Sequence, residues 1–308
     1  MNRGAAFYRN VARLALPILL QNLCTTLLGL IDTFMVGALG EAPLAAVLVA
    51  NIPVFVIQLV IFGLQSGSSV LISQYRGKGD LRAINRVMGI GMYAAGAIGL
   101  AFALIMGFLP GQFMSLFGDD PQVVAVAARY ARIVGWSYFF DSFVQVYNGV
   151  HRAMGNPTRG LYILGVSMAC NTFLNWVFIF GNLGAPRLGV EGAALATLLA
   201  RILSCAIAVV WAVRDKGFRL DPSLLFHPGP EMIRRFIRFS TPVMCNETFW
   251  GLGTSIFPTI MGHMAGSEEI LAAYAIAGNI TNLCTVGVFA IAGTAAILVG
   301  QEIGSGNA

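Results

Sequence analysis

Long apolar runs fill most of this chain, and short polar or glycine-rich segments separate them. A helix needs roughly 20 residues to cross the hydrocarbon core of a bilayer, and eight of the runs reach about that length. They do not alternate between apolar and polar residues as barrel strands do, and backbone groups in lipid must bond within their own segment. The pattern predicts an all-α polytopic membrane protein. Its spans are expected at about residues 14–37, 46–72, 87–109, 124–153, 160–181, 191–213, 239–262 and 270–300.

The composition agrees with lipid as the main solvent. Hydrophobic residues make up 57% of the 308 residues and charged residues only 11%, which a water-soluble domain of this size does not show. Most of the 19 Lys and Arg residues fall at one set of span ends, and such residues stay on the cytoplasmic side of a membrane. This distribution predicts a cytoplasmic amino terminus. It also explains the net charge of +5 without a nucleic-acid partner.

A glycine motif occurs twice, each time at the end of an apolar span. Gln74-x-x-Gly77 closes the second span and Gln301-x-x-Gly304 closes the eighth. Six spans lie before the second copy begins, so both copies enter the membrane in the same direction. The sequence therefore predicts parallel repeats, a build that alternating-access transporters use.

The repeat defines the expected domains. They are an amino-terminal lobe of six spans at 1–213, a cytoplasmic link at 214–238 and the start of a carboxy-terminal lobe of two spans at 239–308. Within the link, residues 231–238 alternate at helical spacing, which predicts a short amphipathic segment at the membrane surface.

Polar residues inside a membrane are costly, so each needs a structural or functional explanation. In antiparallel helices, residues at equal distance from a tight turn lie at the same depth, because the helix rises about 1.5 Å per residue. An oxygen cluster with a single carboxylate suits a sodium ion or a proton. The alternative is that such residues only join helices by hydrogen bonds. The side chains predicted to share one slab near the middle of the membrane are Asp32, Asn148, Asn171, Asn175 and Thr197.

A second group of polar residues predicts a substrate cavity. Tyr138, Asp141, Gln145 and Asn148 recur at helical spacing and form a polar stripe on the fourth span, which is expected to face a water-filled cavity. Asn22 belongs to a similar stripe on the first span. Asp141 is interpreted either as a substrate contact or as a solvated residue at the mouth of the cavity.

The seventh span carries its own candidates for the cavity. Glu247 is the only acidic side chain of that span, and a carboxylate in the membrane can bind a proton or an organic cation. Trp250 lies one turn away and can present its ring to a cationic ligand. Contact with another helix for Glu247 and simple packing for Trp250 are the alternatives.

The sequence contains no motif that indicates an enzyme. Neither a His-Glu-x-x-His helix, nor a Gly-x-Ser-x-Gly turn, nor a P-loop is found. No His and Cys residues have metal-ligand spacing. We therefore expect no catalytic residue, no organic cofactor and no metal beyond a sodium ion at Asp32.

Several short motifs follow one another along the chain: Ile31-Asp32-Thr33-Phe34-Met35-Val36-Gly37, Leu44-Ala45-Ala46, Gln74-x-x-Gly77-x-Gly79, Arg152-Ala-Met-Gly155-Asn156 and Asn171-x-x-x-Asn175. Each motif is loose, but their order and spacing together are specific. The chain resembles the multidrug and toxic compound extrusion (MATE) family over essentially its whole length. Asn175 stands where some members carry a second Asp, which is typical of the NorM-like branch.

The resemblance implies twelve helices in two six-helix lobes around a central cavity. It implies export of cationic amphipathic compounds in exchange for sodium ions or protons by alternating access. It also implies a bacterial inner membrane as location, lipid and small organic cations as partners, and a monomer. The residues that match the family's amino-lobe cation site are Asp32, Asn148, Asn171, Asn175 and Thr197.

Only eight of the family's twelve helices are expected in this chain, so we interpret it as truncated after the eighth. Two alternative functions remain open. One is a lipid-linked oligosaccharide flippase of the same superfamily, although such flippases typically line the cavity with basic residues and this sequence predicts an acidic, amide-rich interior. The other is a non-transporting membrane fragment.

Overall fold

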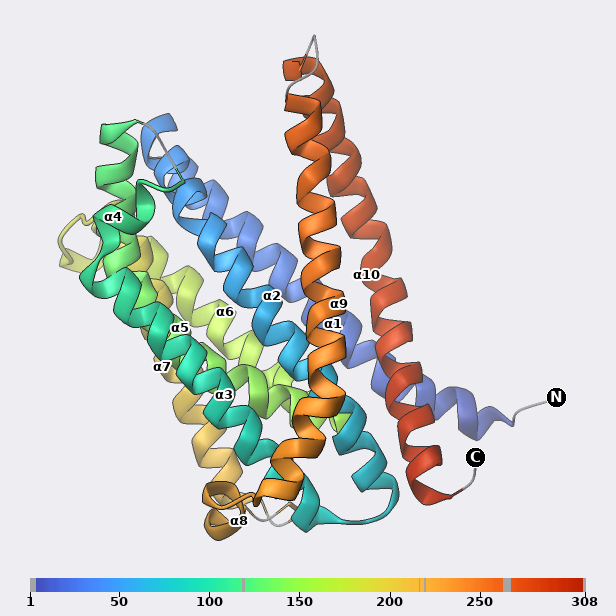
Figure 1. Ribbon diagram of the computed structural model, residues 1–308. Helices are drawn as coiled ribbons and strands as arrows, with labels where there is room; N and C mark the ends of the chain where they lie inside the picture. Colours follow the sequence, from blue (N-terminus) through green and yellow to red (C-terminus); the bar gives the residue numbers. More distant parts are fainter. Residues whose placement is uncertain (1–3, 118–119, 216, 219, 263–266, 307–308) are drawn as a thin grey trace.

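The computed structural model describes residues 4–117, 120–215, 217–218, 220–262 and 267–306. Over these residues the chain is helical apart from short connections, without any strand, which confirms the all-α prediction (Figure 1). The long helices correspond one to one with the predicted spans. They are α1 (Ala5–Gly37), α2 (Glu41–Gly77), α3 (Leu81–Phe108), α5 (Pro121–Ala153), α6 (Thr158–Phe180), α7 (Val190–Arg214), α9 (Pro230–Gly262) and α10 (Ser267–Ser305).

Six of these helices are long and apolar enough to cross a membrane: α1, α2, α3, α6, α7 and the Cys284–Ser305 part of α10. Helices α5 and α9 do not meet that criterion over the described residues. Helix α5 carries many polar side chains, including Arg129, Arg132, Asp141 and Arg152. It packs against α2, α3 and α7, so most of its polar residues are enclosed by protein rather than lipid. The chain is therefore a multi-pass membrane protein in which one span has its polar side turned inward.

Three short helical segments were not predicted from the sequence: α4 (Pro110–Met114), the 3-10 turn Asn182–Gly184 and α8 (Pro222–Phe226). The predicted amphipathic segment at 231–238 forms the first turns of α9, which runs without interruption from Pro230. A period of 3.6 residues is common to a surface helix and a membrane helix, so the pattern could not show that the two were continuous.

Local chemistry explains where several helices begin and end. The Asp80 carboxylate accepts a hydrogen bond from the Ala83 N–H at 2.9 Å and caps the start of α3. Asp120 caps α5 in the same way through the Gln122 N–H at 2.8 Å. Gly181 ends α6 in the left-handed conformation, with a φ of 77° that glycine adopts without strain.

An ion pair joins the neighbouring ends of α6 and α7. Arg159 in the first turn of α6 donates to the carboxylate of Asp215, the residue after α7. Burial alone would raise the pKa of Asp215, but the hydrogen bonds from Arg159 and from the Gly217 N–H outweigh it and hold the pKa below its ordinary value. The pair therefore stays ionised at neutral pH and fixes the two helix ends to each other.

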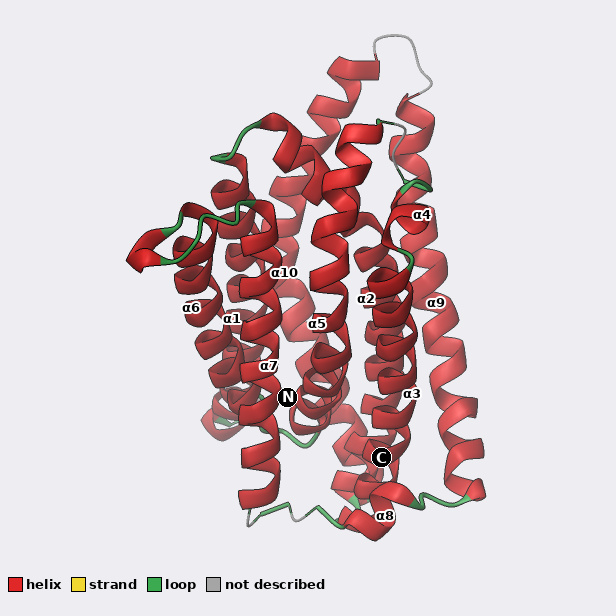
Figure 2. Cartoon of the chain, turned by 90° about the vertical axis from the view of Figure 1, so that its left-hand side faces the viewer, coloured by secondary structure: helices red, strands yellow, loops and turns green. Residues whose placement is uncertain are grey.

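The second repeat packs onto the first through α2. Helices α9 and α10 both lie against α2 (Figure 2), and in Figure 1 their hairpin diverges from the α1–α7 bundle toward the top of the view. A Cβ atom placed on Gly77 would overlap the carbonyl of Gln301, and one placed on Gly304 would overlap the carbonyl of Gln74. The two copies of the glycine motif thus contact each other reciprocally, and only glycine permits this close approach.

Replacing Gly304 with Ala should lower the stability of the chain by about 1 to 3 kcal/mol, because the added methyl group forces α10 away from α2. Thermal unfolding in detergent measures the change. Gly293→Ala in the same helix is the matched control, since a Cβ atom there meets nothing within 4 Å. Equal melting temperatures for the two variants would show that the close contact does not hold the repeats together.

Candidate functional site

A chain of side-chain hydrogen bonds links three helices in the amino-terminal lobe. Asn175 Nδ2 on α6 donates to Asp32 Oδ1 on α1 at 2.7 Å and to Asn171 Oδ1 at 3.1 Å. Asn171 Nδ2 donates to Thr197 Oγ1 on α7 at 3.2 Å, and the Thr197 hydroxyl donates to the Ala193 carbonyl at 3.0 Å. We call the residues Asp32, Asn171, Asn175 and Thr197 the Asp32 chain.

The local sequence explains how these residues meet. Asn171 and Asn175 are four residues apart and lie on the same side of α6, which packs against both α1 and α7. Asn175 is 1% exposed and Asn171 3%, so both amides face the interior of the bundle. Asp32 is half-buried.

One hydrogen-bond acceptor in the Asp32 chain has no donor. Asn175 gives its amide hydrogens to Asp32 and Asn171, and no donor within the described residues reaches its buried Oδ1 atom. A buried acceptor without a partner is unfavourable. A free oxygen next to a carboxylate is the kind of donor set that a hard monovalent cation prefers. The arrangement can therefore hold a sodium ion, or a proton on Asp32.

Asn148, the fifth residue predicted for this site, is not part of the Asp32 chain. It lies on α5 beside Gln21 and Gly160 and lines a separate cavity. Its Oδ1 atom is buried and receives no hydrogen bond from the described residues. Counting residues from a turn gives depth along a helix but not the direction in which a side chain points. The structure therefore does not bring Asn148 to the Asp32 chain, and it places Asn148 in the cavity wall, where the polar stripe of this helix was expected.

The cavity has a volume of about 340 Å³ and lies between α1, α2, α5, α6 and α7. Four of the predicted substrate residues line it: Asn22, Tyr138, Asp141 and Gln145. Neither Glu247 nor Trp250 is among the lining residues; both lie on α9, where Glu247 is half-buried and the Trp250 side chain is 57% exposed. The structure thus separates the candidates of the second repeat from those of the first.

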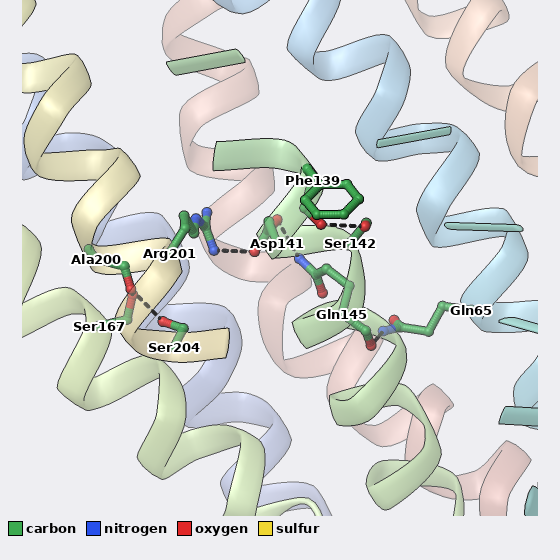
Figure 3. Close-up of polar contacts among 9 residues, drawn as sticks. All are labelled: Gln65, Phe139, Asp141, Ser142, Gln145, Ser167, Ala200, Arg201 and Ser204. Carbon is green, nitrogen blue, oxygen red and sulfur yellow. Dashed lines mark hydrogen bonds and ion pairs between the residues drawn. The ribbon is translucent and has the colours of Figure 1, made fainter. Parts of the chain in front are cut away.

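Asp141 is buried rather than solvated. It is 3% exposed and forms an ion pair with Arg201 on α7, with 2.6 Å between Asp141 Oδ1 and Arg201 Nη1 (Figure 3). Gln145 Nε2 lies 3.5 Å from Asp141 Oδ2, and Gln65 Nε2 donates to the Gln145 carbonyl at 2.6 Å. The carboxylate is therefore already compensated by a positive charge.

Arg201 was not predicted to belong to either site. It is the only charged residue inside the predicted span 191–213 other than Glu191 at its start. A charge within a membrane span normally has a partner, and this signal could have paired Arg201 with Asp141.

The expectation of an acidic cavity was also wrong. The charged residues of the lining are Asp141, Arg152 and Arg201, so cations outnumber anions there. The Arg152 guanidinium donates to Gln21 Oε1 at 3.0 Å. The amide-rich character was predicted correctly, because Gln58, Gln65 and Gln145 contribute to the wall together with the asparagines.

The apolar helices enclose the Asp32 chain and a polar cavity. This is the architecture of a membrane transporter. The MatE family model matches residues 17–177, which is more than half of the chain. The chain therefore belongs to the MatE family.

Two curated relatives are probable multidrug resistance proteins NorM. The protein from Thermotoga maritima is 25% identical over 97% of this chain and 64% of its own length. The protein from Bradyrhizobium diazoefficiens is 29% identical over 98% of this chain and 65% of its own length. The chain thus spans about two thirds of the length of these relatives.

Solved structures agree with the sequence relatives. A MATE crystal structure in the bent conformation superposes with a TM-score of 0.86 at 25% identity, covering 97% of this chain and 66% of that one. An outward-facing multidrug resistance MATE transporter gives a TM-score of 0.84 at 25% identity, with 96% and 65% covered. The predicted two-lobe MATE fold is confirmed for the part that the chain contains.

Replacing Asn175 with Leu should destabilise the chain by about 1 to 3 kcal/mol, because Asp32 and Asn171 both lose their buried donor. Thermal unfolding in detergent at neutral pH measures the loss. Thr172→Val on the same helix is the control, since the buried Thr172 hydroxyl makes no side-chain hydrogen bond. A melting temperature for Asn175→Leu that equals that of Thr172→Val would contradict the hydrogen-bond chain.

Proposed function

We propose that this protein is a secondary active transporter that exchanges cationic amphipathic compounds for sodium ions or protons by alternating access. The observation that carries the proposal is the Asp32 chain: a carboxylate inside the membrane, fixed by the Asn175 amide beside an unpartnered amide oxygen. A cation that occupies such a site lowers the cost of keeping the carboxylate in the membrane further.

The position of Asp32 supports a role in coupling. It lies on α1, and α1 contacts both α6 of its own lobe and α10 of the second repeat. Ile18 on α1 packs in one cluster with Ala290 and Ile297 of α10. A charge change at Asp32 therefore acts on a helix that belongs to one lobe and contacts the other. We place the amino terminus in the cytoplasm and the chain in a bacterial inner membrane.

A lipid-linked oligosaccharide flippase is the second candidate, and one observation favours it. Arg152 reaches the cavity and bonds to the neutral Gln21, so its positive charge is available to an anionic headgroup. A structural neighbour from Pyrococcus furiosus, with a TM-score of 0.85, is described as having a binding pocket of reverse polarity. We rank this function second because Arg201, the other basic residue of the cavity, is neutralised by Asp141.

Asp32→Asn should abolish efflux of ethidium from proteoliposomes driven by a sodium or proton gradient. Removing one partner of a buried charge interaction costs about 3 to 5 kcal/mol, which corresponds to a loss of at least about 100-fold in cation affinity. Asp120→Asn, an exposed helix cap, is the matched control. Unchanged ion-driven efflux in Asp32→Asn would refute the proposal, and preferential binding of a polyprenyl pyrophosphate over ethidium would favour the flippase.

A further inference from the structure

Helix α7 connects the Asp32 chain to the cavity. Thr197, the last side chain of the hydrogen-bond chain, precedes Arg201 by four residues, so the two residues lie one turn apart on the same side of α7. Thr197 faces Asn171 on α6, whereas Arg201 reaches Asp141 on α5 in the cavity wall (Figure 3). One helix face thus contacts both polar sites.

Helix α7 also brings the charged groups of the two sites into one region. It contacts α1, which carries Asp32, as well as α5 and α6, and its Arg201 forms the ion pair with Asp141. Two carboxylates and one guanidinium therefore share this region, and together they lack one positive charge. Tyr138 lines the same cavity as Asp141 and Arg201, and Cys205 follows Arg201 by four residues on α7.

We propose that Arg201 is the positioning residue that couples the two sites, by pairing with Asp141 when the coupling cation is at Asp32 and with Asp32 when an organic cation is at Asp141. The proposal rests on the function proposed above and names the means of exchange. Asp32, Asp141 and Arg201 together lack one positive charge, and the coupling cation or the organic cation supplies it.

The exchange follows from charge balance in a poorly solvated region. An organic cation that enters the cavity competes with Arg201 for Asp141, because two cations at one carboxylate repel each other. The released guanidinium then neutralises Asp32, and the sodium ion or proton held there leaves. The reverse sequence reloads the coupling cation and returns Arg201 to Asp141. Cation and substrate are thereby bound alternately rather than together.

The test counts the coupling cations that leave when tetraphenylphosphonium binds to the purified chain in nanodiscs. Displaced ²²Na⁺ and released protons are added together. The wild-type chain should lose about one cation for each tetraphenylphosphonium bound. Arg201→Gln should lose almost none, because Asp32 and Asp141 can then hold one cation each. Arg201→Lys keeps the charge and should retain most of the exchange.

Two controls separate folding from coupling. Arg129→Gln removes an arginine whose ion pair with Glu191 lies on the surface, and it should exchange like the wild type. The pair Arg201→Gln with Asp141→Asn restores the charge balance and should still bind the coupling cation through Asp32. Such binding shows that the site remains folded without Arg201.

The outcomes also distinguish this inference from the proposed function. If Arg201→Gln still releases about one cation per tetraphenylphosphonium, the role of Arg201 is refuted while the Asp32 site stands. If the wild-type chain binds no tetraphenylphosphonium, the exchange proposed for Arg201 is refuted as well. If the wild type and Asp32→Asn bind sodium ions and protons equally, the proposed coupling site itself fails.

Discussion

The carboxylate of Asp32 is the constraint on which the arrangement of the amino-terminal lobe depends. A charge inside a membrane is tolerated only if it faces the protein interior and has partners there. Asn175 supplies that partner, and Asn171 and Thr197 orient Asn175 in turn. Because these residues come from α1, α6 and α7, satisfying one carboxylate fixes how three helices face one another.

The same constraint explains why α5 is the most polar of the central helices. It is packed against α2, α3 and α7, so Asp141 and its neighbours face a cavity instead of lipid. The Asp141–Arg201 ion pair then joins α5 to the helix that ends the Asp32 chain. The hydrogen-bond chain and the cavity are therefore two parts of one polar interior, separated by a single turn of α7. At the other side of the lobe, the reciprocal glycine contacts bring the second repeat against α2.

The sequence predicted most of the fold, because membrane helices are defined by long apolar runs that local composition reveals. It also predicted that Asp32, Asn171, Asn175 and Thr197 share a depth, and the structure brings these four together. It was less complete where direction mattered. Asn148 lines the cavity instead of joining the Asp32 chain, and Glu247 is not among the residues that line it. Depth follows from residue counting, whereas the side to which a residue points depends on helix packing that a single sequence does not show.

The sequence also did not reveal ion pairs between helices that lie far apart along the chain. Arg201 and Asp141 are 60 residues apart, and no local pattern connects them. The acidic and amide side chains of the interior were predicted from the sequence, but the arginine that neutralises one of the acids was not. This omission produced the incorrect expectation of an acidic cavity, and it hid the charge relation between the cavity and Asp32.

Infrared difference spectroscopy tests the central claim most directly, because it detects a carboxylate that gains or loses a cation. Spectra of the chain in nanodiscs are compared between sodium chloride and choline chloride, and between acidic and neutral pH. We predict a carboxylate difference band in the wild type and in the double variant Arg201→Gln with Asp141→Asn that is absent from Asp32→Asn. The same band in Asp32→Asn would show that another group takes up the cation and would contradict the account.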